Sequence, residues 1–310
     1  MSDPAIRVIL DVDTGVDDAL AMALAVNHPR VDLEAVIAVA GNVSLDRTSR
    51  NSLKVLDWLG ATSVPVYAGA VGPLSGVLRE ASYWHGQDGL GGACLPESSR
   101  GVEPDGIGYL CRRLMAAPGE LTLVCTGPLT DLALALEREP RIVRRVHEVV
   151  LMGGAARLPG NTTPVAEFNI YADPEAAARV FEQPWPITMV GLDVTERVRL
   201  QPSDLMPLAA NDSAAAVLLR EVCHFLFDVC GEDSLALHDP LALLVAVHPD
   251  LVVRRRHDVR VETRGACTLG MTIVDWRMDA PPPARHTRIC TEVAAERARA
   301  LFFTTLGLGS

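Results

Sequence analysis

The sequence predicts an α/β fold in which helices cover a mainly parallel, open sheet. Short runs rich in Val, Ile and Leu recur along the chain, and segments with a helical spacing of apolar residues separate them. Strands that are covered on both faces are apolar along their whole length, as these runs are. Because parallel strands need crossover connections, the alternation predicts parallel strands joined by helices.

Strands and helices are expected to alternate as far as about residue 192. The expected strands are apolar and often β-branched, and the expected helices have polar residues on one face. The strands cover residues 6–10, 33–40, 64–67, 121–125, 146–152 and 187–192, and the helices cover 17–26, 47–59, 105–116, 130–138 and 174–181. This succession is typical of a Rossmann-like sheet.

After residue 192 the pattern changes, and a C-terminal extension of helices and strands is expected. Residues 203–247 have mostly helical spacing, 258–293 contain β-like runs such as 267–274, and a last helix is expected near 294–306. No repeat, low-complexity tract or linker divides the chain, and α/β folds often exceed about 250 residues as one unit. We therefore expect residues 1–310 to form a single domain.

Two long segments, 69–104 and 153–173, are rich in Gly, Pro and small polar residues and fit neither pattern. Loops of this length in a compact domain are usually functional or disordered. Both segments follow a predicted strand, and open α/β sheets bind ligands beyond the C-terminal ends of their strands. These loops are therefore expected to border a binding site.

The charge and cysteine content exclude several functions. The chain has 28 Lys and Arg against 39 Asp and Glu, a net charge of −11, which repels nucleic acid and anionic membranes. Lys54 is the only lysine. The seven cysteines are scattered and never spaced Cys-x-x-Cys, which argues against a disulfide framework or a zinc site. With neither a signal peptide nor a long apolar span in the sequence, a cytoplasmic location with reduced thiols is expected.

Four carboxylates lie within eight residues where the first strand meets the first helix, namely Asp11, Asp13, Asp17 and Asp18. A helix N-terminus stabilises one or two of them by capping and by its dipole. Four hard oxygen donors at one point suit Mg²⁺ or Ca²⁺ better. The pattern favours a metal site, with a capped helix and solvated acids as the alternative.

A strand ending in Asp-x-Asp-x-Thr also opens phosphatases of the haloacid dehalogenase type. Asp11 would then be the nucleophile and Asp13 the acid/base. However, Thr14 comes one position early, and these enzymes need a lysine well downstream, whereas Lys54, the only lysine, lies only about forty residues on and within a predicted helix. The phosphatase interpretation is therefore a minor alternative.

The segment Asp11–Met22 (DVDTGVDDALAM) resembles the opening signature of the nucleoside hydrolases, calcium-dependent enzymes that cleave the N-glycosidic bond of ribonucleosides. Further matches follow in the family's order at Gly41-Asn42, His85-Gly86, Thr126–Thr130, Met152–Gly154, Asn161, Ala166–Asn169, His238–Pro240 and Val274–Arg277. Each match is weak alone, and the ordered set is strong. The resemblance implies an inosine/uridine-preferring nucleoside N-ribohydrolase. Thr14 stands where most relatives have proline, which removes no ligand.

The resemblance implies a calcium ion held by the carboxylates of Asp13, Asp18 and Asp239, the backbone carbonyl of Thr126, two ribose hydroxyls and a water. Asp13 would also be the general base that deprotonates this water. Asp11 is expected only to support the loop.

Asp239 has a second interpretation. In sequence it precedes Pro240 as Asp173 precedes Pro174, and Asp-Pro is a common start of a helix with the aspartate as its N-cap. Only the resemblance makes Asp239 a ligand, and Asp173 is expected to be a cap.

The resemblance also implies substrate contacts, which are Asp17, Asn42, His85, Met152, Asn161, Glu167, Phe168 and Asn169. Carboxylates and amides suit the vicinal hydroxyls of ribose. Glu167 and Asn169 alternate around Phe168, so in an extended backbone both would point to one side. As isolated residues, Asn42 and Asn161 are equally well explained as turn residues that follow glycine.

His238 is the candidate acid for departure of the base. Cleavage passes through a ribosyl cation like the oxocarbenium state of glycosidases, so the sugar needs negative charge nearby and the base needs a proton. His85 is expected beside the base. Its neighbours Tyr83 and Trp84 either stack on the base or anchor the loop as buried aromatic residues.

We therefore expect a calcium-dependent nucleoside N-ribohydrolase that forms a homodimer or homotetramer. The alternative from another class is a calcium-dependent nucleoside- or ribose-binding protein without turnover, and the presence of Asp13 and His238 argues against it. Purine or pyrimidine preference stays open, because the family varies most around residues 75–92 and 220–238.

Overall fold

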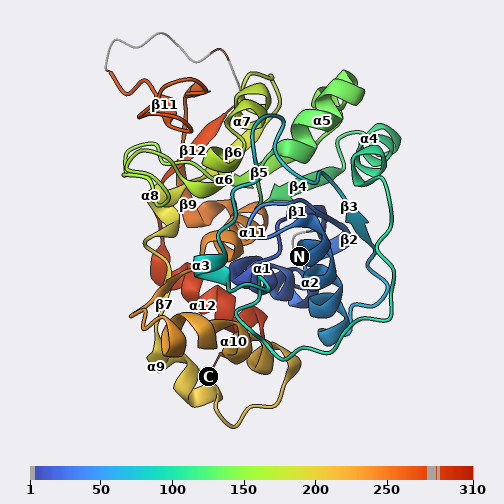
Figure 1. Ribbon diagram of the computed structural model, residues 1–310, viewed down its shortest axis with the longest axis vertical. Coiled ribbons are helices and arrows are strands. Elements are labelled where there is room, and N and C mark those ends of the chain that lie inside the picture. Colours follow the sequence, from blue (N-terminus) through green and yellow to red (C-terminus); the bar gives the residue numbers. More distant parts are fainter. Residues whose placement is uncertain (1–3, 278–283, 285–286, 310) are drawn as a thin grey trace.

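The computed structural model of the chain describes residues 4–277, 284 and 287–309. One open sheet has the strand order β3 (Val66–Ala68), β2 (Val31–Ala38), β1 (Ile6–Val12), β4 (Leu121–Cys125), β5 (Glu148–Met152), β6 (Ile187–Val190), β12 (Arg288–Val293) and β9 (Val252–Arg256) (Figure 1). All neighbours from β3 to β12 run parallel, and β9 pairs antiparallel with β12. The predicted α/β fold with a mainly parallel sheet is confirmed.

Helices connect most of these strands and also form the C-terminal part. They are α1 (Val16–Asn27), α2 (Leu45–Trp58), α3 (Ser82–His85), α4 (Gly106–Ala116), α5 (Thr130–Arg138), α6 (Phe168–Ala172), α7 (Pro174–Phe181), α8 (Leu192–Thr195), α9 (Pro202–Leu205), α10 (Ala214–His224), α11 (His238–Val247) and α12 (Ala295–Thr305). Two small antiparallel sheets pair β7 (Arg199–Leu200) with β8 (Leu235–Ala236) and β10 (Val259–Val261) with β11 (Thr272–Val274). Short 3₁₀ turns cover Pro140–Arg144, Met206–Leu208 and Pro249–Leu251, and a π-helix covers Phe225–Val229.

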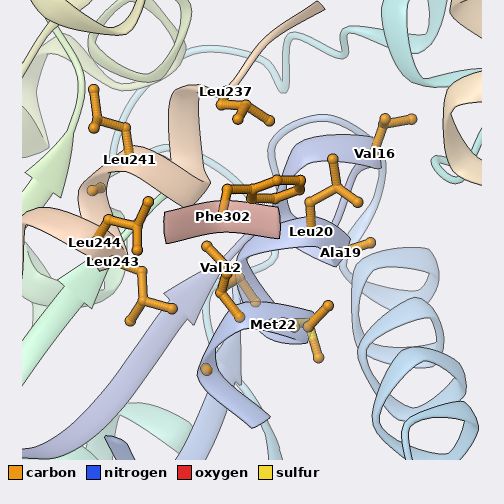
Figure 2. Close-up of a cluster of buried hydrophobic side chains, with 14 of the residues drawn as sticks. Val12, Val16, Ala19, Leu20, Met22, Leu237, Leu241, Leu243, Leu244 and Phe302 are labelled. Carbon is orange, nitrogen blue, oxygen red and sulfur yellow. The ribbon is translucent and has the colours of Figure 1, made fainter. Parts of the chain in front are cut away.

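Each face of the sheet buries its own apolar layer, because side chains alternate along each strand. From β1, Val8 and Leu10 belong to the layer shared with α1, α2, α10, α11 and α12, whereas Ile9 belongs to the layer shared with α4, α5 and α7 (Figure 1). Phe302 of α12 is fully buried and lies between Leu20 of α1 and the apolar side chains of α11 (Figure 2). These contacts fix α1 and α11 against the sheet.

The strand order reverses between β1 and β4, and this switch point positions the polar residues. The chain proceeds outward from β1 through β2 to β3 and then returns to β4 on the other side of β1. At this point the Thr126 N–H donates to the Asp11 carbonyl (2.8 Å) and the Val39 N–H donates to the Val12 carbonyl (2.8 Å). The loops that follow β1, β2 and β4 therefore meet at one edge of the sheet, where such folds bind ligands.

The C-terminal half departs from the expectations in three places. The strand expected at 187–192 ends at Val190, because the chain turns at Gly191, where a Cβ would lie 2.5 Å from the Gly154 carbonyl oxygen. The run expected at 267–274 is a strand only over Thr272–Val274, because the preceding residues form a turn. Edge strand β9, which contains three consecutive arginines, was not expected.

The other expectations for the C-terminal part are confirmed, except where they concern residues that the structure does not describe. Residues 203–247 are mostly helical as expected, with the two-residue strand β8 between the π-helix and α11. The last helix is present as α12. Residues 278–283 and 285–286 of the predicted β-containing stretch lie outside the described residues.

Candidate functional site

The turn between β1 and α1 carries two fully buried aspartates, Asp13 and Asp18. Gly15 is the N-cap of α1, and its N–H donates to Asp18 Oδ2 at 2.9 Å. The other oxygen of Asp18 accepts the Thr126 hydroxyl at 2.7 Å. The helix-start alternative therefore accounts for one oxygen of Asp18 and for the place of Asp17 in the first turn of α1, but it does not account for Asp11 or Asp13, which precede the helix.

Asp13 faces the loop that follows β2. Its Oδ2 accepts the N–H of Asn42 at 2.7 Å, while its Oδ1 is buried and has no hydrogen-bond partner among the described residues. The close approach depends on Gly41, on which a Cβ would lie 2.1 Å from Asp13 Oδ2. A buried carboxylate oxygen without a partner is costly, so this oxygen is available to a ligand or a proton.

Asp17, Asp18 and Asp239 form an acidic cluster, in which one carboxylate oxygen from each lies within 4.8 Å of the others. Asp239 lies in the first turn of α11, whose N-cap is Leu237, so the cap interpretation of Asp239 is wrong. Asp173, in contrast, does cap α7, because it accepts the N–H of Ala176 at 3.0 Å. The two Asp-Pro pairs are alike in sequence, but Asp173 caps a helix whereas Asp239 belongs to the acidic cluster.

The charges of these aspartates oppose one another. Burial and then the charge of Asp18 raise the pKa of Asp13. Burial and then the charge of Asp17 raise the pKa of Asp18 to about 7. The same two causes, burial and neighbouring aspartates with Asp17 first, raise the pKa of Asp239. Buried carboxylates that disfavour each other's ionisation suit a divalent cation, because its charge removes the repulsion. The acidic cluster can therefore hold a metal ion.

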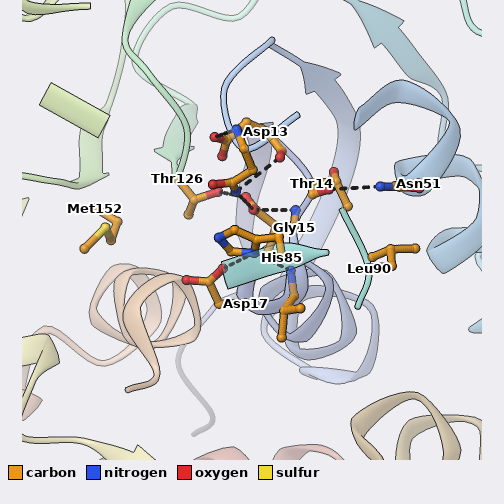
Figure 3. Close-up of polar contacts among 12 residues, drawn as sticks. Asp13, Thr14, Gly15, Asp17, Asn51, His85, Leu90, Thr126 and Met152 are labelled. Atoms are coloured by element: carbon orange, nitrogen blue, oxygen red, sulfur yellow. Dashed lines mark hydrogen bonds and ion pairs between the residues drawn. The ribbon is translucent and has the colours of Figure 1, made fainter. Parts of the chain in front are cut away.

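The acidic cluster differs by one residue from the carboxylate ligands that the resemblance implies, which are Asp13, Asp18 and Asp239. Asp17 stands beside Asp18 and Asp239, and Asp13 is not part of the compact group. Asp13 is nevertheless near enough for its charge to raise the pKa of Asp239. Figure 3 shows Asp13, Asp17 and Thr126 around the turn that begins α1.

Glu167, Asn169 and Thr126 are connected by hydrogen bonds. Asn169 donates its amide to the Thr126 carbonyl at 2.6 Å. Glu167 accepts the N–H groups of Asn169 (2.8 Å), Gly154 (2.9 Å) and Ile170 (3.2 Å). The extended backbone expected around Phe168 is wrong, because the Glu167 carboxylate caps α6 and places Asn169 in its first turn.

One pocket opens above these residues and brings nearly all of the predicted site together. The predicted residues that line it are Asp17, Asn42, His85, Thr126, Met152, Asn161, Glu167, Phe168, Asn169, His238 and Asp239. Asp13 and Asp18 are not among the lining residues and are fully buried. Asn42 and Asn161 also support the loops, since Asn42 Nδ2 lies 3.3 Å from Asp18 Oδ2 and Asn161 Oδ1 accepts the Phe168 N–H at 3.0 Å.

Both histidines of the pocket are held through Nδ1. The N–H of Val16 donates to His85 Nδ1 at 3.1 Å, so the neutral His85 ring carries its proton on Nε2. His238 Nδ1 lies 2.8 Å from the Thr195 hydroxyl oxygen. Burial lowers the pKa of both rings, and the charge of Asp17 opposes this shift. Figure 3 shows Asp17 beside His85, with 3.9 Å between Asp17 Oδ1 and His85 Nδ1.

The pocket is also lined by residues that the sequence analysis did not name individually. They include Glu196 and Arg199, and also Leu226, Glu232 and Ser234 from the stretch 220–238 in which the family varies; Arg199 donates from Nε to Ser234 Oγ at 2.8 Å. Glu196 and Arg199 follow the C-terminal end of β6, so the strand-end rule that identified the other loops could have found them. Tyr83 and Trp84 line the pocket with exposed fractions of 58% and 40%, so the buried-anchor interpretation is wrong.

The structure also bears on the expectations for the single lysine, the cysteines and a membrane span. Lys54 lies on α2, where it pairs with Glu97, and it is not among the residues that line the pocket. The acidic cluster therefore has no lysine partner of the kind that the phosphatase interpretation requires. All seven cysteines are free thiols. In the part of the chain that the structure describes, no helix has both the length and the apolar character needed to cross a bilayer.

Known proteins share this fold and are similar to this chain in sequence. The signature of a family described as inosine-uridine preferring nucleoside hydrolase matches residues 8–300. An inosine-uridine preferring nucleoside hydrolase of Leishmania major is 39% identical over 90% of this chain and 90% of its own length. The pyrimidine-specific ribonucleoside hydrolase RihA of Citrobacter koseri is 38% identical, covering 88% and 89%. A solved purine-preferring ribonucleoside hydrolase from Gardnerella vaginalis superimposes with a TM-score of 0.89 and 32% identity over 97% of this chain and 98% of that one.

Proposed function

This chain belongs to the inosine-uridine preferring nucleoside hydrolase family and hydrolyses the N-glycosidic bond of ribonucleosides, and from that premise we propose that it acts with a calcium ion bound among its buried aspartates. The observation that carries the proposal is the convergence of four aspartates, of which Asp17 and Asp239 line the pocket, while Asp13 and Asp18 are buried close enough for their charges to raise the pKa of Asp239. Without a cation, this arrangement is disfavoured by desolvation and by mutual repulsion.

The ion would be held by the carboxylates of Asp13, Asp18 and Asp239 and by the carbonyl oxygen of Thr126. The burial of all four residues supports this set, as does the chemistry of the donors, because Ca²⁺ prefers carboxylate and carbonyl oxygens. A bound calcium ion would supply positive charge that anchors two ribose hydroxyls and makes a nearby water more acidic. Asp17, the third member of the compact cluster, is assigned to the ribose.

Asp13 is proposed as the general base. Its Oδ2 is fixed by the Asn42 N–H, which leaves the unpartnered Oδ1 to accept a proton from the attacking water. The electron pair of that water then forms the new bond to C1′ of the ribose. Asp11, buried behind this loop, is proposed only to support it.

Five polar side chains are proposed to bind the ribose, namely Asp17, Asn42, Asn161, Glu167 and Asn169. All five line the pocket. Hydrogen bonds to neighbouring groups fix the orientation of Asn42, Asn161, Glu167 and Asn169 before substrate arrives, which limits the entropy lost on binding. Met152 and Phe168 supply apolar contacts in the same wall.

His238 is proposed to protonate the departing base, with His85 beside it. The two rings are close enough for the charge of His238 to lower the pKa of His85, which supports a common subsite for the base. Tyr83 and Trp84 are exposed at the pocket and available to stack on that base.

We further propose a homodimer or homotetramer, as the resemblance implies, and a reducing compartment such as the cytoplasm, which the seven free thiols favour. The preferred base is not assigned, because the relatives' names range from pyrimidine-specific to purine-preferring.

The test is the release of reducing sugar and free base from inosine, uridine, cytidine and adenosine by the calcium-loaded protein. We expect equimolar ribose and base from at least one of them. Saturable binding of a nucleoside without release of sugar would instead support the nucleoside-binding alternative and contradict the proposal.

A further inference from the structure

We propose that Thr195 is a positioning residue for the reaction, which holds the ring of His238 so that its Nε2 faces the departing base. The inference rests on the proposed function, in which His238 is the acid. Thr195 is fully buried at the end of α8, and its hydroxyl oxygen lies 2.8 Å from His238 Nδ1.

The backbone holds these two side chains opposite each other. Strands β7 and β8 pair Arg199 with Ala236 and Leu200 with Leu235, and the Leu237 N–H donates to the Val198 carbonyl at 2.8 Å. The segment after Thr195 and the segment before His238 therefore run antiparallel along their length. Because both main chains are fixed, the contact between hydroxyl and ring follows from the fold.

The contact selects which ring nitrogen serves the substrate. An imidazole has two nitrogens, and occupation of Nδ1 by Thr195 leaves Nε2 for the pocket that His238 lines. The acid is the doubly protonated ring. As the bond between C1′ and the base breaks, the base nitrogen keeps the bonding electron pair and takes the proton from Nε2. The ring, now neutral, keeps its other proton on Nδ1, which donates a hydrogen bond to the Thr195 hydroxyl oxygen.

His85 provides an internal comparison. Its Nδ1 also has a partner, but that partner is the backbone N–H of Val16, which can only donate. While this bond persists, His85 Nδ1 cannot hold a proton, so the ring cannot give up the proton on Nε2 and remain neutral. A hydroxyl can donate or accept a hydrogen bond. With Thr195 as its partner, His238 can keep a proton on Nδ1 and give up the proton on Nε2, whereas His85 cannot do so while the Val16 N–H occupies its Nδ1.

The experiment compares two kinds of substrate. Natural nucleosides such as inosine or uridine need a proton on the base, whereas p-nitrophenyl riboside releases a stable anion and does not. Thr195→Val removes the hydroxyl and keeps the shape. We expect it to lower kcat for the natural nucleoside by about 10-fold, the scale of one lost hydrogen bond, and to change kcat for the nitrophenyl riboside by less than about 2-fold.

Three further variants control the experiment. Thr195→Ser keeps the hydroxyl and is expected to restore most of the activity. Thr188→Val on β6 removes another buried threonine hydroxyl, which donates to Glu148 of β5 at 2.6 Å, and it should leave the ratio of the kcat values for the two substrates unchanged. His238→Ala should slow the natural nucleoside by roughly 10²-fold or more, and Thr195→Val should add nothing to it.

Failure of the inference is distinguishable from failure of the proposed function. If His238→Ala slows the natural nucleoside while Thr195→Val does not, or if Thr195→Val slows both substrates equally, Thr195 does not position the acid and the proposed function stands. If His238→Ala leaves the natural nucleoside unaffected, the proposed acid itself is wrong. Should the valine variant not fold, Thr195→Ala, which adds no bulk, is measured in its place.

Discussion

Buried aspartates of this chain divide into those that stabilise the fold and those that leave oxygens unsatisfied. Asp173 is fully buried and accepts hydrogen bonds from Ala176 (3.0 Å), Thr130 (2.7 Å) and Leu74 (2.8 Å). Asp13 is equally buried, but only one of its oxygens has a partner among the described residues. Burial alone therefore does not separate a structural carboxylate from one that we propose to be catalytic, whereas the hydrogen-bond partners do.

This difference predicts opposite results for two matched substitutions. Asp13→Asn should lower kcat by about 10²–10⁴-fold, the usual scale for a lost general base, because the amide cannot accept the proton. It should not lower the melting temperature of the metal-free protein, because it also removes repulsion from Asp18. Steady-state kinetics and thermal unfolding measure both.

Asp173→Asn is the control for that prediction. It should lower stability by about 1–3 kcal/mol, since one oxygen that accepts hydrogen bonds is replaced by a donor in a buried site. Its kcat should stay within about 2-fold of the parent. Equal losses of activity in the two variants would show that the assignment of Asp13 as base is wrong.

Most residues that line the pocket could be predicted from the sequence, but not all of the residues that hold them in place. Residues that follow strand ends within recognisable motifs, such as Asn42 and Thr126, do line the pocket. Thr195 was not identified, because its value depends on antiparallel pairing between β7 and β8, two strands of two residues each. Pairings this short leave no periodic signal in the sequence.

Helices α1 and α11 are built alike, because each has an acidic side chain in its first turn and each ends at a histidine. The C-caps are His28 for α1 and His248 for α11, and their Nε2 atoms lie 3.1 Å apart. His28 Nδ1 also accepts the Arg30 N–H at 3.1 Å. This contact joins the two helices at the ends remote from the acidic cluster.

The histidine contact predicts a pH dependence of stability. Burial, followed by the charges of His248 and Arg30, lowers the pKa of His28 below 6.5. The unfolded chain then binds the proton at higher pH than the folded one, so the contribution of His28 to the free energy of unfolding falls as pH drops below about 6.5. Above that pH it is constant.

The measurement is urea unfolding of the parent and of His28→Asn between about pH 7.5 and pH 5. Buried aspartates with raised pKa values shift stability in the opposite direction over part of this range, so the difference between the two proteins is compared. The parent should lose more stability on acidification than the variant, whereas the surface variant His147→Asn should follow the parent. Parallel curves for the parent and His28→Asn would contradict the account.

Helix α12 is predicted to stabilise this pair of helices from outside. Phe302→Ala should cost about 3–5 kcal/mol, because the ring is fully buried against α1 and α11 and its removal leaves a cavity. Phe303→Ala, next to it and only partly buried, should cost less than half as much. Denaturant unfolding of the metal-free variants compares them, and similar losses would show that α12 does not bury Phe302 as described.

Elements on the buried part of the sheet were predictable because their apolar runs are continuous, as in β4 and β5. Edge strand β9 was missed because it contains Arg254, Arg255 and Arg256, charges that suit an exposed edge and hide the strand pattern. The helix α6 was missed because its start depends on one side chain, the cap formed by Glu167. Local polar contacts, unlike burial, leave little periodicity in a sequence.

For the whole molecule, the sheet order explains why acids far apart in sequence converge. Asp13 follows β1, and Thr126 follows β4. Asp239 lies in the first turn of α11, which packs against β4 and β5. The fold thus gathers negative charge at the switch point of a chain that already carries a net charge of −11. A cation bound there should stabilise the folded state, since ligands that bind only the native state add to its stability.

The central claim is that this chain needs calcium at its acidic cluster to hydrolyse ribonucleosides, and removal and return of the metal test it most directly. Protein stripped by a chelator should release no ribose from inosine or uridine and should melt at a lower temperature. Return of Ca²⁺ should restore both activity and melting temperature in the parent, with about one ion bound per chain. Asp239→Asn should bind the ion more weakly, because it loses a proposed ligand. Full activity of the stripped protein, with no calcium detectable by elemental analysis, would contradict the account.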